Sequence, residues 1–178
     1  EEEELSLMRR PISTRDAFKR FGVLLGAFVP AALFYRMFPY NADTNISSGE
    51  QLFALLLLLA MNVICCLTGR FMGSVIGRRI DPYERGSWHL MLAYSLCVGA
   101  FWGIVTGAAG GSLVFIIGAL FGAFVAVPFG IAGFMLFTPL HRLMARGGMI
   151  DARHFWPLAC GVVLTITALI LSPNLYPY

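Results

Sequence analysis

The sequence has little charge, and that scarcity limits its fold class. Only 13% of the 178 residues are charged and 58% are hydrophobic, whereas soluble domains carry about 25% charged residues. Several apolar stretches reach the roughly 20 residues that a helix needs to cross a bilayer. These features exclude an ordinary soluble domain and predict an integral, multi-pass membrane protein.

Chemical motifs are also scarce. The four cysteines lie singly or as a neighbouring pair inside apolar stretches, without the CxxC spacing of zinc or redox sites. No hydrolase, metalloprotease or nucleotide-binding signature is present. No basic face with interleaved aromatics suggests nucleic-acid binding. We therefore expect no enzymatic activity, no metal and no nucleic acid; no cofactor is predicted, although bound lipid is compatible with the sequence.

The apolar stretches predict an all-α bundle of about five transmembrane helices in one domain, residues 21–171. A segment of residues 1–20 precedes it, and a short tail, residues 172–178, follows. Ser13 and Asp16 are spaced as a capping box, so the first helix is expected to begin near Thr14, and Asp151 is expected to cap the last. The five predicted spans are about 21–38, 51–77, 88–108, 113–140 and 155–171.

Two details of these spans follow from glycine and proline. The glycine-rich segment 107–112 is typical of a tight turn between the third and fourth spans. The fourth span is too long for an upright helix, so it is expected to tilt, or to break at Pro128 into a re-entrant pair. The second span is expected to end at Gly77, before Arg78, Arg79 and Pro82.

Basic residues fall almost entirely in the loops that share one side of the predicted membrane. Cytoplasmic loops are enriched in Lys and Arg, so the N-terminus is expected in the cytoplasm and the C-terminus outside. The expected membrane is the bacterial inner membrane or an equivalent one. The residues placed inside are Arg9, Arg10, Arg15, Lys19, Arg20, Arg78, Arg79, Arg85, Arg142, Arg146 and Arg153.

Small residues recur every four positions in four of the predicted spans. Residues four apart lie on one helix face, and in lipid such faces let neighbouring backbones approach closely. We therefore predict tight glycine-mediated helix packing; a face that contacts another protein or lines a narrow path is the alternative. The residues are Gly22, Gly26, Gly69, Gly73, Gly77, Gly99, Gly103, Gly107, Gly111, Gly118, Gly122, Ala126 and Gly130.

Asn62 is the strongest polar residue within a predicted span, about halfway along the second. Buried in lipid it is expected to hydrogen-bond across helices, with a ligand or pore contact as the alternative. No Asp or Glu lies within a span. Ion-coupled transporters usually bind their ion through such a carboxylate, so its absence disfavours a coupled transporter.

Three histidines fall at the predicted cytoplasmic ends of the third, fourth and fifth spans, beside tryptophans and arginines. An aromatic and basic belt against lipid headgroups explains this level of the bundle. The functional alternative is a small inner-leaflet site for an anionic headgroup, a quinone, a metal or a haem. The residues concerned are His89, His141, His154, Trp88, Trp156 and Arg142.

The function most consistent with this pattern is a non-enzymatic membrane subunit or scaffold that packs with partner helices, or with further copies of itself, in a complex. A small channel or transport component is the first alternative, because Pro30 and Pro128 are expected to kink their helices. A quinone- or haem-binding membrane anchor is the second.

Overall fold

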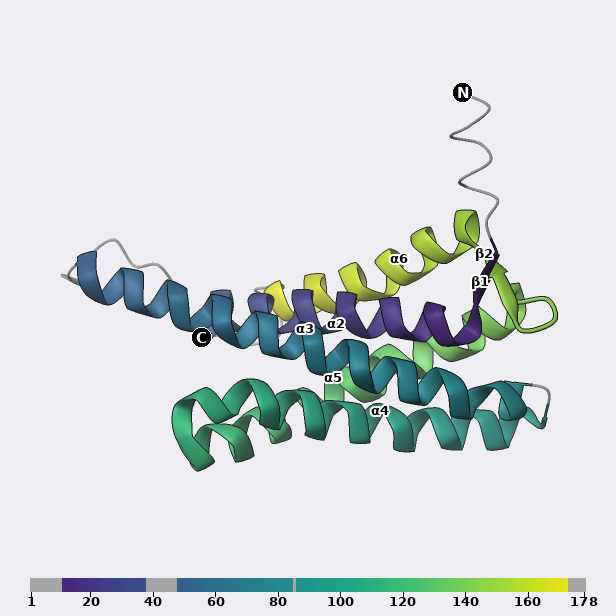
Figure 1. The fold of residues 1–178 in the computed structure, drawn as a ribbon, viewed down its shortest axis with the longest axis horizontal. Helices are drawn as coiled ribbons and strands as arrows, with labels where there is room; N and C mark the ends of the chain where they lie inside the picture. The colour runs from purple at the N-terminus through teal and green to yellow at the C-terminus, as the bar shows by residue number, and fades with distance from the viewer. Residues whose placement is uncertain (1–10, 38–47, 85, 173–178) are drawn as a thin grey trace, which may run out of the picture.

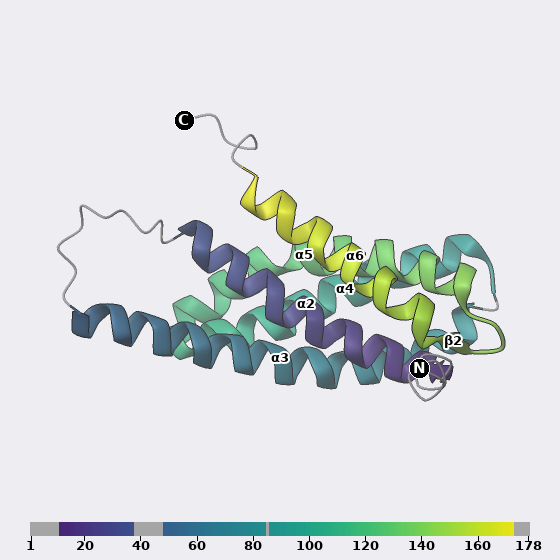
Figure 2. The ribbon, with the colours of Figure 1, turned by 90° about the horizontal axis from the view of Figure 1, so that it is seen from above.

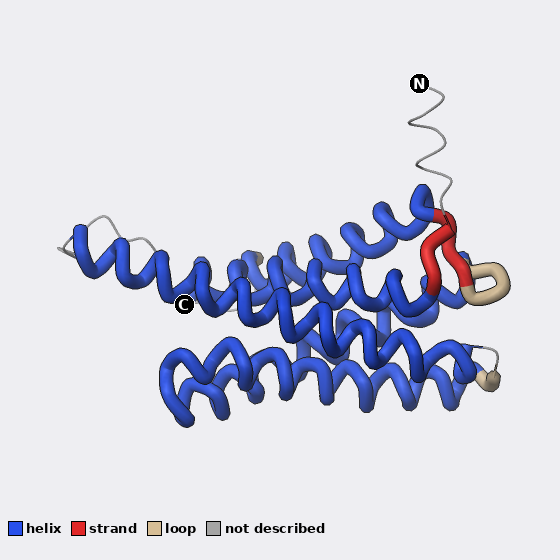
Figure 3. The backbone as a smooth tube through the Cα atoms, viewed as in Figure 1, coloured by secondary structure: helices blue, strands red, loops and turns tan. Residues whose placement is uncertain are grey.

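The structure is a computed structural model that describes residues 11–37, 48–84 and 86–172, apart from the side chains of residues 37, 48 and 81–84. It consists of five long α-helices, a short 3₁₀ helix and a two-stranded ribbon (Figures 1 and 3). The all-α prediction is thereby confirmed. The elements in chain order are β1 (Pro11–Ser13), α2 (Thr14–Met37), α3 (Ser48–Glu84), α4 (Trp88–Gly111), η1 (Ser112–Val114), α5 (Phe115–Met144), β2 (Met149–Asp151) and α6 (Ala152–Leu171).

Four stretches of helix are long and apolar enough to cross a membrane. Three of them are single helices, within Thr14–Arg36, Gly49–Ile80 and Ala152–Leu171. The remaining stretch, Trp88–Met144, contains both α4 and α5 with η1 between them. The chain is therefore a candidate multi-pass membrane protein with four such stretches, one of which is folded into a hairpin.

The helices run side by side as an elongated bundle. In Figure 1 the α4–α5 hairpin forms the lower part, α2 and α6 lie above it, and α3 runs along the front over the whole length. Figure 2 shows that α2 and α3 are close at the end that carries β2 and diverge toward the other end. The bundle is thus compact at one end and open at the other.

Several predicted boundaries were wrong. α3 continues past Gly77 to Glu84, because a proline in the last turn of a helix removes a single backbone hydrogen bond without breaking the preceding turns. The expected turn at 107–112 is helical up to Gly111, and the chain reverses at η1 instead. α5 is one helix through Pro128, so the re-entrant pair is ruled out.

Both predicted helix caps on described residues are confirmed. At the start of α2, Asp16 N–H donates to Ser13 Oγ at 3.2 Å, and Ser13 Oγ donates to Asp16 Oδ2 at 3.0 Å. At the start of α6, Arg153 N–H donates to Asp151 Oδ1 at 3.2 Å. Both caps satisfy N–H groups that a helix leaves unpaired at its first turn.

The two strands were not predicted. β1 pairs with β2 antiparallel, with Ile12 opposite Ile150, and both isoleucines are buried. The turn before β2 has positive φ at Gly147 (61°) and Gly148 (78°), as two-residue hairpin turns of the I′ type require. The segment between α5 and α6 is therefore ordered, and its strand β2 attaches the start of α2 to the start of α6.

An aromatic cluster holds α2, α5 and α6 together in the half of the bundle next to the ribbon. Phe21 and Phe137 stack with ring centroids 4.0 Å apart, and Phe18 meets Phe137 edge-on at 5.1 Å. Phe155 of α6 approaches Phe137 edge-on at 6.2 Å. Such pairs add about 0.5–1.5 kcal/mol each beyond the area they bury, so this cluster fixes the three helices relative to one another.

Candidate functional site

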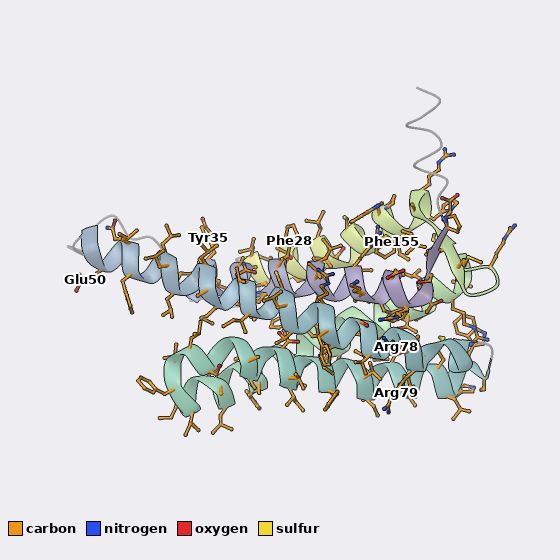
Figure 4. The ribbon with its side chains drawn as sticks, in the orientation of Figure 1. Phe28, Tyr35, Glu50, Arg78, Arg79 and Phe155 are labelled. Atoms are coloured by element: carbon orange, nitrogen blue, oxygen red, sulfur yellow. The ribbon has the colours of Figure 1, made fainter. Side chains whose placement is uncertain are left out.

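The end of the bundle that carries the ribbon also gathers the basic residues, and we refer to it as the basic end. α2 begins there, α3 and α5 end there, and α6 begins there (Figures 1 and 2). Figure 4 shows Arg78 and Arg79 on α3 toward this end and Glu50 at the opposite end of the same helix. The described basic residues at the basic end are Arg15, Lys19, Arg20, Arg78, Arg79, Arg142, Arg146 and Arg153.

The three histidines do not form one site. His141 is fully buried, with its ring 5.3 Å from Phe18 and 5.7 Å from Phe137, measured between centroids. His89 and His154 are exposed. Across residues 11–37, 48–84 and 86–172, no three His, Cys, Asp or Glu side chains lie close enough to hold a metal ion. A ligand at the surface could not reach His141 together with the other two.

The predicted tryptophans and Arg142 form two separate pairs. Arg142 lies over the ring of Trp88, 4.3 Å from its centroid, and donates to the Gly86 carbonyl at 2.8 Å. Arg20 lies 5.8 Å from the centroid of Trp156. Cation–π contacts of this kind contribute about 0.5–1 kcal/mol at exposed positions. Arg142 therefore connects α5 to the start of α4, and Arg20 connects α2 to α6.

The predicted glycine faces lie between helices. A Cβ added to Gly99 would be 2.6 Å from the Gly130 carbonyl oxygen, and one added to Gly103 would be 2.7 Å from that of Ala126. Farther along, Gly107 faces Gly122 and Gly111 faces Gly118. Each step of four residues along α4 meets a step of four back along α5, as two antiparallel helices require. At these four positions the backbones of α4 and α5 are so close that even a Cβ atom would clash with the facing carbonyl.

A second row of small residues lies between α2 and α3. Gly22 faces the carbonyl of Gly69, and Gly26 faces that of Cys65. Gly73 meets the Phe18 carbonyl, and a Cβ on Gly77 would be 2.8 Å from the Arg15 Cα. The row ends at Gly26, and Figure 2 shows α2 and α3 diverging toward the end of the bundle away from β2.

Asn62 does not connect helices, contrary to expectation. Its side chain is half-buried, and its Oδ1 accepts a hydrogen bond from Cys66 Sγ at 3.7 Å, one turn along the same helix. The neighbouring helices approach α3 at Cys65 and Gly69 instead. Asn62 lies on the same side of α3, one turn beyond Cys65, where the close contacts between α2 and α3 end.

Two surface pockets lie at the basic end, next to the ribbon. The larger, about 690 Å³, is lined by apolar side chains of Leu143, Met144 and Met149 and by the polar Arg146, Asp151 and His154. The smaller, about 280 Å³, lies between the start of α2, Gly77 and Arg78 of α3, and the turn Gly147–Gly148. Neither lies between the apolar halves of the helices.

The first part of α3 is apolar and has few contacts within the chain. Its exposed residues Leu52, Leu56, Leu59, Val63 and Leu67 recur at steps of three and four, so they form one stripe along the helix. The last turn of α4 reaches only the level of Met61 and Cys65, where a Cβ on Gly110 would contact both. α3 extends beyond that level in Figure 1.

Comparison of the chain with protein-family models, curated proteins and solved structures gives no match. Its function must therefore be inferred from the geometry of the molecule itself.

Sequence reasoning missed two features of this region. The aromatic cluster was detectable, because Phe18, Phe21 and Leu25 are spaced as one helix face and so are Phe134, Phe137 and His141. The smaller pocket was not detectable, because it depends on a long-range strand pairing that brings Gly147 beside α2.

Proposed function

We propose that this chain is a non-catalytic, multi-pass subunit of a membrane protein complex, in which a helix of a partner chain packs along the exposed stripe of α3. The observation that carries the proposal is the first part of α3. α3 is the longest described helix and is strongly apolar. No other described part of the chain covers its stripe from Leu52 to Leu67.

Glycine packing supports a scaffold. Lipid offers apolar side chains nearly the same environment as a protein core, so helices in a membrane associate largely through close van der Waals contact. The rows between α2 and α3 and between α4 and α5 bring backbones into such contact. Two rigid hairpins of this kind would hold the stripe of α3 in a fixed position for a partner.

The proposed orientation places the basic end in the cytoplasm and the C-terminus outside, in the bacterial inner membrane or an equivalent membrane. The positive-inside tendency supports it, since α2, α3, α5 and α6 all bring arginines to this end. Arg36 and Arg70 lie outside the basic end. Arg36 is at the end of α2, and its side chain is held by the carbonyls of Ile170 and Ser172. Its position thus has a structural explanation of its own.

Gentle extraction followed by native mass analysis tests the proposal. We expect this chain to migrate with another membrane chain, or with further copies of itself, in a fixed ratio. The double variant Leu56→Ala and Leu59→Ala should weaken that association by about tenfold, because the few residues that carry most of the binding energy lie at the centre of an interface and cost over 1 kcal/mol when truncated.

A matched control uses exposed apolar residues outside the stripe. Phe121→Ala and Phe124→Ala, on α5, should leave the association unchanged. If the wild-type chain remains a monomer under all extraction conditions, or if both double variants behave alike, the subunit proposal is contradicted. Solute flux into liposomes that contain this chain alone would favour the channel alternative. A haem or quinone absorption band in the purified chain would favour the anchor alternative.

A further inference from the structure

The smaller pocket at the basic end has the composition of an anion site. It is lined by one arginine from each of two helices, Arg15 of α2 and Arg78 of α3, and none of the described residues that line it is acidic. Neither arginine forms an ion pair with a carboxylate of the described residues. Arginine binds phosphate oxygens through paired, charge-assisted hydrogen bonds. We propose that this pocket binds the phosphate of an anionic phospholipid headgroup from the leaflet at the basic end.

The local hydrogen bonds leave suitable donors in the pocket. Arg15 Nε donates to Ser74 Oγ at 3.4 Å, which fixes the stem of the side chain and leaves its terminal nitrogens available. The carbonyl of Gly148 is occupied, because it accepts from Thr14 N–H at 3.1 Å and from Thr14 Oγ1 at 3.0 Å. The hydroxyl of Ser13 is occupied by Asp16.

The turn itself adds backbone donors. Gly147 and Gly148 both have positive φ, and the hydrogen bonds across this turn join Arg146 and Met149 rather than the two glycines. Successive backbone N–H groups in such turns form concavities that bind anions. Arg15, Arg78 and this turn therefore line one pocket of about 280 Å³, which is large enough for a phosphate group.

The position of the pocket favours a lipid as the source of the phosphate. Trp88 and Trp156 lie at the basic end, paired with Arg142 and Arg20, and tryptophan is enriched where protein meets the headgroup region. Basic pockets between helices on the cytoplasmic side bind phosphate-bearing lipid headgroups. The choice of a lipid rests on the proposed orientation, whereas phosphate recognition rests only on the pocket.

Native mass spectrometry of the purified full chain in nonionic detergent tests the inference, with phosphatidylglycerol, phosphatidylcholine and inorganic phosphate as separate probes. We expect one phosphatidylglycerol per chain, bound about tenfold more tightly than phosphatidylcholine. The double variant R15Q/R78Q should lose about tenfold in affinity for phosphatidylglycerol, since it removes two charge-assisted contacts. The matched double variant R79Q/R153Q removes the same charge from exposed residues outside the pocket and should bind like the wild type.

Three other outcomes would overturn the inference. Equal losses of phosphatidylglycerol affinity in both double variants would show diffuse attraction to a basic surface, and unchanged affinity in R15Q/R78Q would exclude the pocket. Inorganic phosphate that binds as tightly as the lipid and depends on Arg15 and Arg78 would identify a free anion as the ligand. If R15Q/R78Q does not fold by circular dichroism, R78Q is compared with R79Q. The experiment needs no partner chain. The lipid inference can therefore fail while the subunit proposal stands, and the subunit proposal can fail while the lipid inference stands.

Discussion

Arg36 shows how one residue can serve a structural purpose against the general charge pattern. It lies in the last turn of α2, at the end of the bundle opposite the basic end. Its Nη1 donates to the carbonyls of Ile170 and Ser172 at the end of α6. The last carbonyls of a helix have no partners within the helix, and a cation there also interacts favourably with the helix dipole. Arg36 therefore fastens the ends of α2 and α6 together.

The variant Arg36→Met should loosen the end of α6 while keeping the aliphatic stem. Hydrogen bonds to charged groups contribute about 1.5–3 kcal/mol, so we expect a loss of that order in local stability. Hydrogen exchange of the amides at residues 166–171 measures it directly. Arg36→Lys, which keeps the charge, should show a smaller effect; protection equal to the wild type in Arg36→Met would contradict the account.

Phe115 holds the strained backbone of the α4–α5 turn. Its φ of 60° and ψ of −172° fall in a region that is essentially restricted to glycine. The side chain is 86% exposed, so packing within the chain does not offset the strain. The reversal of the chain between α4 and α5 requires this backbone conformation at the residue that follows η1.

We therefore expect Phe115→Gly to stabilise the purified protein by about 1 kcal/mol, because it relieves a conformation that costs about 1–3 kcal/mol while freeing some backbone entropy in the unfolded state. Thermal unfolding in detergent, compared with Ile116→Gly as the control at an adjacent helical position, measures the difference. A melting temperature of Phe115→Gly at or below that of Ile116→Gly would refute the strain.

At the scale of elements, the sequence predicted the helix starts that depend only on residues within one helical turn. Ser13, Asp16 and Asp151 cap their helices as their spacing predicts. The end of α3 was misplaced because a proline in the last turn does not break the turns before it. The reversal after α4 was misplaced because the glycines up to Gly111 stay helical while they pack against α5. The ribbon was missed because β1 and β2 are three residues each and lie far apart in sequence.

The cap of α2 gives a test at this scale. Asp16→Ala removes one half of the capping box and should destabilise the first turn by about 1 kcal/mol. Hydrogen exchange at the amides of residues 15–18 should accelerate accordingly, whereas exchange at residues 25–30 of the same helix should not change. Uniform acceleration along α2 would mean that Asp16 supports the whole helix by another route.

At the scale of the molecule, composition and spacing predicted an all-α fold with several apolar, membrane-spanning stretches, but they could not predict which helices meet. The antiparallel registers of α2 with α3 and of α4 with α5 follow from glycines that face one another, and a glycine row alone does not name its partner. The histidines illustrate the same limit. The sequence predicted all three at one depth in the membrane, but His141 is buried in the bundle whereas His89 and His154 are exposed. Three of the residues predicted on the cytoplasmic side, Arg9, Arg10 and Arg85, lie outside the described residues, as do residues 38–47 and the tail from 173.

The proposed scaffold depends on backbone contact between α4 and α5, and one stability comparison tests it most directly. The double variant Gly103→Leu and Gly107→Leu places side chains against the carbonyls of Ala126 and Gly122, and overpacking of this kind costs at least ~1–3 kcal/mol. Gly161→Leu, on α6, is the control, because a Cβ there meets nothing within 4 Å. We predict that thermal unfolding in detergent shows a folded, near-wild-type Gly161→Leu and an unfolded or strongly destabilised Gly103→Leu/Gly107→Leu protein; equal melting temperatures for the two would contradict the glycine contacts on which the scaffold rests.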